Sequence, residues 1–236
     1  MTQEESVPPQ DTPAVQAVTP APRPRLNWQR IWLDGLFVMA GVLLALIADE
    51  WRQDRLDRER AARALHEIKD EVAANRGAIR ESLDYHLSII TGLRDVESSD
   101  IAPGALFRRG FIHPAQVLRT AWETGNATDA VAHLKYDEVL LLSRVYEQQQ
   151  GYTRQSEQIS QLIYERLFDD GFDGMLENHA NLSIIVGTLV YRECGLISLY
   201  DDAMKKLGVD VPADAPPPAC GRALKDEQEN QAGRTP

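Results

Sequence analysis

Few residues of this chain of 236 residues have the type and spacing that chemistry needs. Glu67, Asp70 and Glu71 lie beside His66, and carboxylates next to an imidazole are potential metal ligands. No supporting constellation completes a ligand set, so we interpret this run as a solvated helix face. The chain also lacks a glycine-rich phosphate loop, a nucleophile elbow and a His-Glu-x-x-His pair. The sequence therefore predicts no catalytic, metal or cofactor site, and an enzyme is conceivable only through scattered residues that folding brings together.

Four aromatic residues in the second half of the chain are the best candidates for a ligand pocket. Helical folds build such pockets between facing helices, and aromatic side chains are common lining residues. We expect a pocket between the helices of residues 120–168 and 175–207. Its predicted lining residues are Trp122, Tyr146, Tyr152 and Tyr191.

Charge and cysteine content narrow the classes of partner. The chain has 25 basic and 36 acidic residues and a net charge of -11, whereas general nucleic-acid binding needs a basic face that displaces counterions from phosphates. Nucleic acid is therefore not an expected partner. Cys194 and Cys220 are too few for a disulfide framework or a zinc site. They form a single bridge in an oxidising compartment or stay as two free thiols.

The spacing of apolar residues predicts an all-α protein. Between residues 25 and 208 they recur every three or four positions, and proline occurs only at Pro103 and Pro114. We expect an N-terminal transmembrane helix that continues into a long stalk helix, packed with later helices as an antiparallel helical bundle. The predicted divisions are a Pro-rich disordered tail (1–26), the transmembrane helix (27–51), the stalk and seam helix (52–98), the rest of the bundle (99–208) and a second disordered tail (209–236).

Turn and capping residues divide the rest of the bundle. Pro114 is suited to the first turn of a helix over 114–124. Asn126 or Thr128 can cap a short helix that ends near Leu134. The predicted long helices are 136–168 and 175–207, separated by a turn at 170–174, and Gly208 ends the second in a left-handed cap.

An apolar run from Ile31 to Ala48 predicts a membrane-spanning helix. Asp34 is its sole charge, and its length falls at the short end of the roughly 17 to 25 residues that a spanning helix needs. A cleavable signal peptide and a buried core helix are the alternatives, but the tail before the run is too long for the first, and the second would show a polar face. Indoles that favour the membrane interface flank the run at Trp28, Trp32 and Trp51.

Small residues inside the run allow another helix to approach. Gly41, Ala45 and Ala48 stand at small-xxx-small spacing, which favours homo-association or contact with another membrane protein. Asp34 either reaches back to water and Arg30 or makes a polar contact with a partner helix.

A strict 3,4 repeat follows the span and predicts a helix–helix seam. Between span and repeat, Asp54 with Arg58 and Glu59 with Arg63 stand at the spacing of ion pairs, which lets the helix continue through water. The seam residues are Leu65, Ile68, Val72, Asn75, Ile79, Ile89 and Leu93. A buried asparagine in such a seam can fix register and partner number. The seam packs on this chain's own later helices or forms an intermolecular coiled coil.

Two blocks of the chain resemble a family of bacterial single-pass membrane proteins classed as a domain of unknown function. The first block has Asn27-Trp28, Asp34-Gly35, the stretch GVLLAL-ADEW ending at Trp51, and LHEIKDEVAANR over 65–76; the second is residues 120–150. The resemblance implies an inner-membrane protein with a cytoplasmic tail and an extracytoplasmic helical domain, and it implies no activity.

Orientation in the membrane follows from two conflicting indications. Five arginines between residues 52 and 63, against three before the span, would keep the large domain in the cytoplasm by the positive-inside rule. That rule weakens for long domains, so we follow the resemblance and expect the domain in the periplasm.

The leading hypothesis is a non-enzymatic module, anchored in the lipid bilayer, that binds itself or another envelope protein. The alternative is an extracytoplasmic ligand-sensing or catalytic domain.

Overall fold

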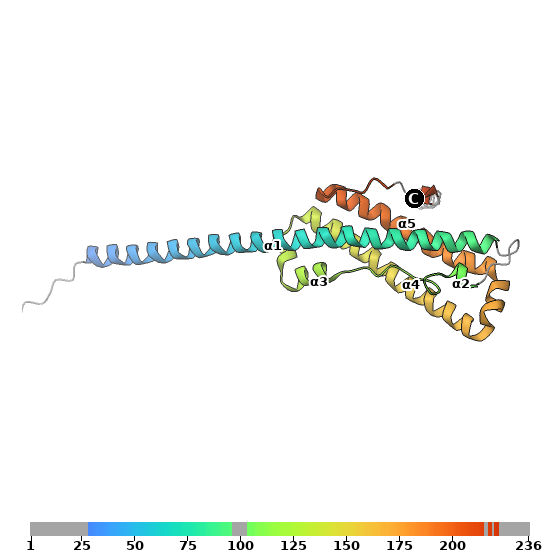
Figure 1. Ribbon diagram of the computed structural model, residues 1–236. Helices are drawn as coiled ribbons and strands as arrows, with labels where there is room; N and C mark the ends of the chain where they lie inside the picture. Colours follow the sequence, from blue (N-terminus) through green and yellow to red (C-terminus); the bar gives the residue numbers. More distant parts are fainter. Residues whose placement is uncertain (1–27, 96–102, 215–216, 219, 222–236) are drawn as a thin grey trace, which may run out of the picture. The chain divides into compact units, whose positions relative to one another are not determined.

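The computed structural model describes residues 28–95, 103–214, 217–218 and 220–221. The elements are α1 (Trp28–Asp95), α2 (Pro103–Leu106), α3 (Thr120–Ala127), the 3-10 helix η1 (Ala130–His133), α4 (Tyr136–Glu177) and α5 (His179–Leu207) (Figure 1). The described part of the chain contains no strand, which confirms the all-α prediction. The predicted N-terminal tail, residues 1–26, lies outside the described residues.

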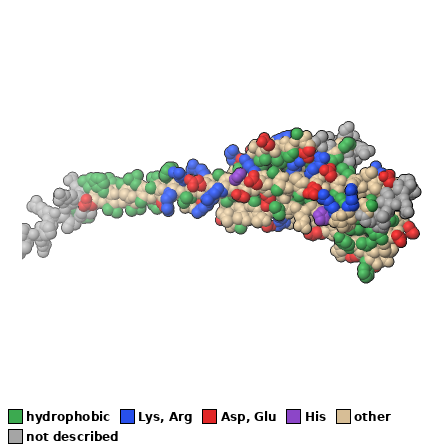
Figure 2. Space-filling model, viewed as in Figure 1, with side chains coloured by type: hydrophobic (Ala, Val, Ile, Leu, Met, Phe, Trp, Pro, Cys, Tyr) green, Lys and Arg blue, Asp and Glu red, His purple; other side chains and the backbone are tan. Residues whose placement is uncertain are grey.

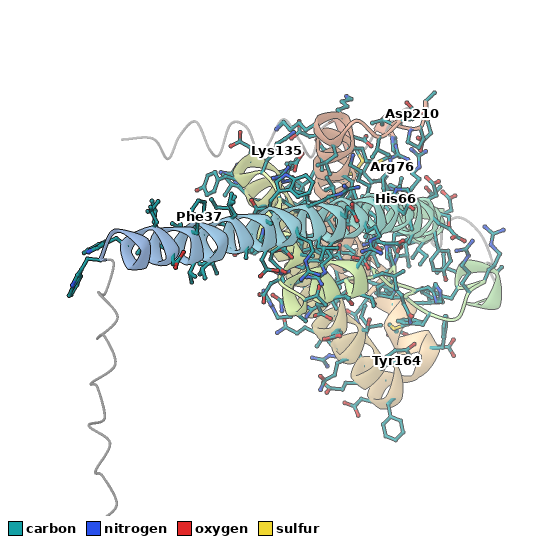
Figure 3. All side chains as sticks on the ribbon, turned by 90° about the vertical axis from the view of Figure 1, so that its left-hand side faces the viewer. Phe37, His66, Arg76, Lys135, Tyr164 and Asp210 are labelled. Carbon is teal, nitrogen blue, oxygen red and sulfur yellow. A yellow bond between two sulfur atoms is a disulfide. The ribbon has the colours of Figure 1, made fainter. Side chains whose placement is uncertain are left out.

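The chain divides into two units between Trp51 and Arg52. The described part of the first unit is α1 up to Trp51, and every side chain described between Trp32 and Trp51 is exposed. Its hydrophobic side chains cover the helix surface in Figure 2 and project outward around Phe37 in Figure 3. This unit is a helix that is apolar on all sides, a property of helices surrounded by lipid or by other protein.

The second unit is a helical bundle built on α4, α5 and the part of α1 that follows Trp51. The first turns of α1 in this unit carry alternating charges: Arg58 lies 3.8 Å from Asp54, as predicted, but Glu59 pairs with Arg55 at 3.1 Å and not with Arg63. Arg63 instead donates to the Glu59 carbonyl at 3.4 Å. Exposed pairs of this kind contribute little to stability, so the exchange of partners has little consequence.

The predicted seam is the face of α1 that packs into the chain's own core. Six of the seven seam residues are at most 1 % exposed, and Leu65 is half-buried against the same core. α4 and α5 supply the opposing side chains, among them Leu142, Ile163 and Leu189. Because this face is covered within the chain, it is not a surface for an intermolecular coiled coil. The buried seam residues are Ile68, Val72, Asn75, Ile79, Ile89 and Leu93.

Two predictions about the middle of the chain are wrong. The helix expected from Pro114 begins only at Thr120, because residues 107–119 take another path that side chains of the bundle hold. Neither Asn126 nor Thr128 caps η1, since both side chains bond back to carbonyls of α3. The residue before η1 is Asp129, which has a left-handed backbone at φ 57°.

The turn expected at 170–174 is a kink inside one helix. Gly171 has φ 67° and ψ -175°, which an L side chain rarely adopts, and α4 resumes after it to Glu177. α5 therefore begins at His179 and not near Met175. Gly208 ends α5 at φ 70°, as predicted, and the Val209 N–H donates to the Met204 carbonyl at 2.8 Å.

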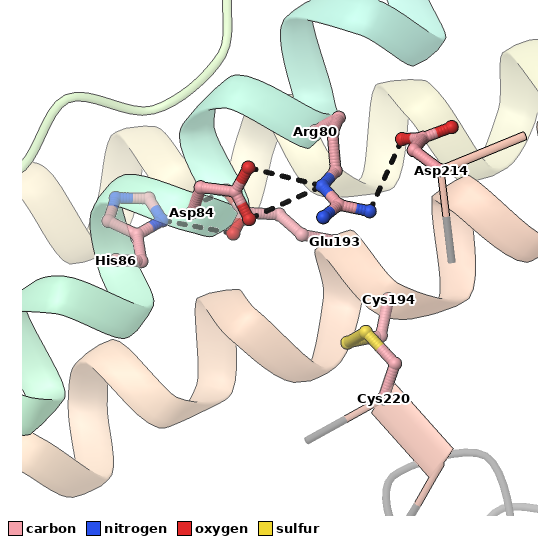
Figure 4. Close-up of a disulfide and its surroundings, with 7 residues drawn as sticks. All are labelled: Arg80, Asp84, His86, Glu193, Cys194, Asp214 and Cys220. Atoms are coloured by element: carbon pink, nitrogen blue, oxygen red, sulfur yellow. Dashed lines mark hydrogen bonds and ion pairs between the residues drawn. A yellow bond between two sulfur atoms is a disulfide. The ribbon is translucent and has the colours of Figure 1, made fainter. Parts of the chain in front are cut away.

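The chain after α5 is attached to the bundle where the structure describes it. Cys220 is 1 % exposed and forms a disulfide with Cys194 of α5, which resolves the alternatives left open by the sequence (Figure 4). Asp214 lies 2.8 Å from the buried guanidinium of Arg76, which also bonds Asp201 at 2.7 Å. The predicted disordered tail therefore does not begin at residue 209; residues 222–236 of it lie outside the described part.

Candidate functional site

Residues 107–119, here called the strap, connect α2 to α3 without a helix of their own, and side chains of the bundle bind their backbone. Four of these bonds hold residues 109–115. The Tyr85 hydroxyl accepts from the Arg109 N–H (3.4 Å) and donates to the Phe111 carbonyl (2.8 Å). The Ser82 hydroxyl donates to the His113 carbonyl (3.1 Å), and the Tyr152 hydroxyl accepts from the Ala115 N–H (3.0 Å). Irregular backbone can be buried only where its polar groups find partners. These side chains therefore fix the path of the strap.

Leu118 is the most tightly held residue of the strap. The Asn75 side chain accepts from the Leu118 N–H and donates to the Leu118 carbonyl, both at 2.7 Å. Gln149 donates to the same carbonyl at 2.7 Å, and its own oxygen accepts from Tyr200 at 2.8 Å. The Leu118 side chain itself is 54 % exposed. Asn75, predicted to fix helix register, thus fixes a segment of backbone.

We expect Asn75→Ala to lower the free energy of unfolding by about 1–3 kcal/mol, because the change leaves the Leu118 N–H without a partner. Chemical denaturation of the full chain in detergent micelles, followed by circular dichroism, measures the loss. Asn181→Ala, at an exposed position of α5, is the control and should change stability by no more than about 0.5 kcal/mol. Equal stability of the two variants would show that Asn75 does not hold the strap.

Glu193 of α5 is the centre of a second buried cluster. Its carboxylate accepts from the hydroxyls of Ser82 (2.8 Å) and Tyr152 (2.9 Å). The Nδ1 atom of His86 lies 2.9 Å and 3.0 Å from the two carboxylate oxygens (Figure 4). A bond from His86 to a carboxylate requires the proton on Nδ1. The cluster joins α1, α4 and α5 at one point.

A carboxylate that orients a histidine is also an arrangement used in catalysis. Here Glu193 and His86 are both 0 % exposed. The His86 Nε2 atom has no hydrogen-bond partner within the described residues, but no described pocket is lined by His86. The geometry therefore supports a structural role, since both side chains are fully buried.

Glu71 of α1 forms a third contact with the region of the strap. Its two oxygens accept from the Ala121 N–H at 2.8 Å and from the Tyr146 hydroxyl at 2.6 Å. Burial and the neighbouring Glu71 raise the pKa of Tyr146 well above its usual value, and burial with the charge of Glu193 does the same for Tyr152. Burial, with the charge of Glu71, also raises the pKa of Tyr200. All three tyrosines are therefore neutral donors in the folded chain.

Arg76 links α1 to α5 and to the chain beyond it. Burial alone would lower the pKa of this guanidinium, but its hydrogen bonds and ion pairs with Asp214 and Asp201 outweigh burial and raise it. In return, the hydrogen bond from Arg76 lowers the pKa of the Asp214 carboxyl. Arg80 adds a second contact to Asp214 at 3.2 Å (Figure 4).

The four residues predicted to line one pocket do not lie together. Trp122 and Tyr146 stack with ring centroids 5.1 Å apart, beside a pocket of about 450 Å³. Tyr152 is buried in the Glu193 cluster, and Tyr191 is 36 % exposed on α5. Neither lines the pocket at Trp122. The predicted pocket is therefore wrong as a single site, although half of it is found.

A larger concavity, here called the groove, lies between α1 and α3 and has a volume of about 960 Å³. The α1 wall carries Arg60, Arg63, Ala64, Glu67, Asp70, Glu71 and Ala74, which repeat every three or four residues on one helix face. The α3 side carries the small residues Thr120, Ala121, Thr124, Gly125 and Thr128, with Leu118 and Ala130 beside them. No sequence pattern pointed to this groove, because α3 was expected to begin elsewhere.

Within the part of the chain that the structure describes, two helices are long and apolar enough to cross a membrane, α1 from Trp32 and α5. The apolar window of α1 is 0 % buried, whereas that of α5 is 44 % buried inside the bundle. The three predicted interface tryptophans are 64–75 % exposed. The predicted helix-contact residues, Asp34, Gly41, Ala45 and Ala48, are exposed as well, and a Cβ added at Gly41 would meet nothing.

No family model matches the chain, and none of the curated proteins or solved structures matches it. The resemblance to bacterial single-pass membrane proteins therefore stays a prediction. Within the described residues, no group of three or more His, Cys, Asp or Glu side chains is placed to hold a metal ion. The candidate functional features are thus the exposed apolar part of α1 and the groove.

Proposed function

We propose that this chain is a non-enzymatic helical module of the bacterial inner membrane, held in the bilayer by the apolar part of α1. Its second unit lies on the periplasmic side and binds another envelope protein or a second copy. The observation that carries the proposal is the exposure of the apolar side chains of this part of α1, for example 72 % for Phe37 and 68 % for Leu44. Each such side chain gains about 1.5–3 kcal/mol when it leaves water, so a series of them favours a bilayer strongly.

Single-pass attachment is supported by the difference between the two apolar helices. α5 contributes Leu189, Ile197 and Tyr200 to the core of the bundle, and its Glu193 is bonded to α1 and α4. Insertion of α5 into lipid would break these contacts and place Glu193 in hydrocarbon. Every described side chain of α1 from Trp32 to Trp51 is exposed, so this part of α1 contributes no described side chain to the core.

The periplasmic side is supported by the bond between Cys194 and Cys220. Disulfides persist in oxidising compartments and are rare in the cytoplasm, where thiols stay reduced. The arginines between residues 52 and 63 favour the opposite orientation, but the positive-inside rule is weak for a long translocated domain. The disulfide is the stronger of the two indications.

Alkylation of cysteines in cells tests both attachment and orientation. We expect the full chain in the membrane fraction, with Cys194 and Cys220 unreactive toward a maleimide until a reductant is added. After reduction, a membrane-impermeant maleimide should label Cys220 in spheroplasts that remain sealed. A Cys220→Ser variant controls for the label on Cys194, which is 1 % exposed.

Two results would contradict the proposal. Recovery of the chain in the soluble fraction would show that α1 does not hold the chain in a membrane. Labelling of both thiols without a reductant, and only after permeabilisation, would place the second unit in the cytoplasm.

Ligand sensing is the second candidate function, and it is favoured by the pocket at Trp122 and Tyr146. The exposed polar side chains of Ser143, Glu147 and Gln150 line this pocket beside the stacked rings. We rank it second because the other two predicted pocket residues lie elsewhere. A thermal-shift screen in which no compound raises the Tm of the full chain would remove this candidate.

A further inference from the structure

The groove between α1 and α3 has a long wall on its α1 side. Its α1 wall runs from Arg60 to Ala74, about 21 Å at about 1.5 Å per residue, which is roughly four helical turns. The opposite wall is formed by small side chains at Thr120 and Thr124 of α3 and at Thr128 directly after it, spaced four residues apart. Small residues at such spacing let the backbone of a third helix come close.

Close packing of α3 on α1 keeps the floor of the groove narrow. Gly125 is buried, and a Cβ added there would lie 3.7 Å from Ala64 and Ile68 and 2.9 Å from Val131. The bonds of Ala121 to Glu71 and of Leu118 to Asn75 hold the same wall. The walls are therefore preformed, which lowers the entropic cost of binding a partner.

Leu118 adds an apolar contact at the edge of the groove. Its backbone is clamped on both polar groups, while its side chain stays 54 % exposed. The held backbone thus presents an exposed apolar side chain to an incoming helix.

The charges of the groove indicate the composition of the partner. Arg60 and Arg63 already bond within α1, to Asp57 and to the Glu59 carbonyl. Further along the wall, Asp70 lies 3.7 Å from His66, and exposed Glu67 makes no hydrogen bond or ion pair within the described residues. The carbonyl that Arg63 bonds is neutral, so the wall presents a positive charge at Arg63 and a negative charge at Glu67. A partner with a basic residue opposite Glu67 is complementary there.

We propose that the groove binds a helix of a different envelope protein, with small or apolar residues against Leu118 and Thr124 and a Lys or Arg against Glu67. The proposal rests on the proposed function. A second copy of this chain is a poor occupant, because two copies anchored by the same helix in one membrane run in parallel. Pairing along this face would then place Arg60 and Arg63 of both copies against each other.

Photo-crosslinking in intact cells tests the proposal with the full chain. A photoreactive amino acid replaces Thr120 or Thr124 on the α3 wall, and Ala127 is the matched control, exposed on the same helix but outside the groove. We expect a discrete protein adduct from Thr120 and Thr124 and none from Ala127. The crosslinked peptide should show small or apolar residues every three or four positions and a basic residue beside them.

A charge reversal identifies the basic contact. Glu67→Lys should lower the yield of the Thr124 adduct by about tenfold or more, since it sets like charges against each other. Glu157→Lys, an exposed change on α4, should leave the yield unchanged. Unchanged Tm values of both variants would show that the bundle is intact.

Other results would overturn the assignment of the groove. They are adducts with lipid, adducts with a second copy, equal yields from Ala127, and a crosslinked peptide without a basic residue. If Thr124 gives no adduct but an amine-reactive crosslinker still joins the chain to a partner, the groove is not the binding site and the proposed function stands. If neither reagent gives a product, the proposed association itself fails.

Discussion

Replacement of Glu193 by alanine is expected to lower the free energy of unfolding by about 3–5 kcal/mol. The carboxylate is 0 % exposed and accepts from Ser82 at 2.8 Å, from Tyr152 at 2.9 Å and from His86 at 2.9 Å. Its removal strands the buried Tyr152 hydroxyl and the Nδ1–H of His86, while the Ser82 hydroxyl keeps the His113 carbonyl as its acceptor. Each unmade bond carries a desolvation penalty. Chemical denaturation of the full chain in micelles, followed by circular dichroism, measures the change.

Two further variants distinguish the loss of the hydrogen bonds of Glu193 from the loss of a glutamate side chain in general. Glu157→Ala removes an exposed glutamate from α4 and should change stability by about 0.5 kcal/mol at most. Glu193→Gln keeps the volume and one acceptor oxygen, so its loss should fall between the two. If Glu193→Ala unfolds at the same denaturant concentration as Glu157→Ala, Glu193 does not hold the three helices together.

The importance of Glu193 has a weak signature in the sequence. The core face of α5 runs through Val186, Leu189, Ile197 and Tyr200 at helical spacing, and Glu193 occupies the same stripe. A lone acid on an apolar stripe indicates a buried carboxylate that needs donors. The donors themselves come from residues 41 to 111 positions away, and spacing along one helix carries no information about them.

The buried face of α1 could be predicted because it depends only on local periodicity. Ile68, Val72 and Ile79 repeat at three and four, and any partner that covers the face gives the same pattern. Asn75 was correctly placed on that face, yet its partner is the backbone of Leu118 and not another helix. Periodicity identifies which residues are buried and leaves their partners undetermined.

The strap shows where local preference is overridden. Pro114 favours the first turn of a helix, and a helix from there would satisfy most backbone groups without help. In the fold, side chains from α1 and α4 supply partners instead, through Ser82, Asn75 and Tyr152. Because these lie 31 to 43 residues from the atoms they bind, sequence reasoning placed α3 six residues too early.

The groove was missed for the same reason, since its second wall depends on where α3 begins. The apolar part of α1 was found because a long run without a polar face needs no partner to be recognised. Whether Cys194 and Cys220 form a disulfide could not be predicted from the sequence, because two cysteines have one possible pairing but two redox states. Features that depend on neighbouring residues could thus be predicted from the sequence, and contacts between distant residues could not.

Alkaline pH is expected to unfold the bundle steeply. Tyr146, Tyr152 and Tyr200 are at most 6 % exposed, and burial raises the pKa of each far above the ordinary value of 10.0. A pKa that is raised in the folded state gives stability that is complete below the unfolded pKa and is lost as pH rises. Above about pH 10 the unfolded chain releases three protons that the folded chain keeps, and stability falls by about 4 kcal/mol per pH unit.

This slope exhausts a typical domain stability of 5–15 kcal/mol within roughly one to four pH units. Tyrosinate absorbance of the three buried rings should therefore appear together with the loss of helical circular dichroism, in one transition. Tyr152→Phe removes one titrating group and should reduce the slope by about a third, although it weakens the Glu193 cluster at neutral pH. Ionisation of all the tyrosines near pH 10, with helix content unchanged, would contradict the burial of these hydroxyls, and with it the polar clusters that fix the strap and the groove.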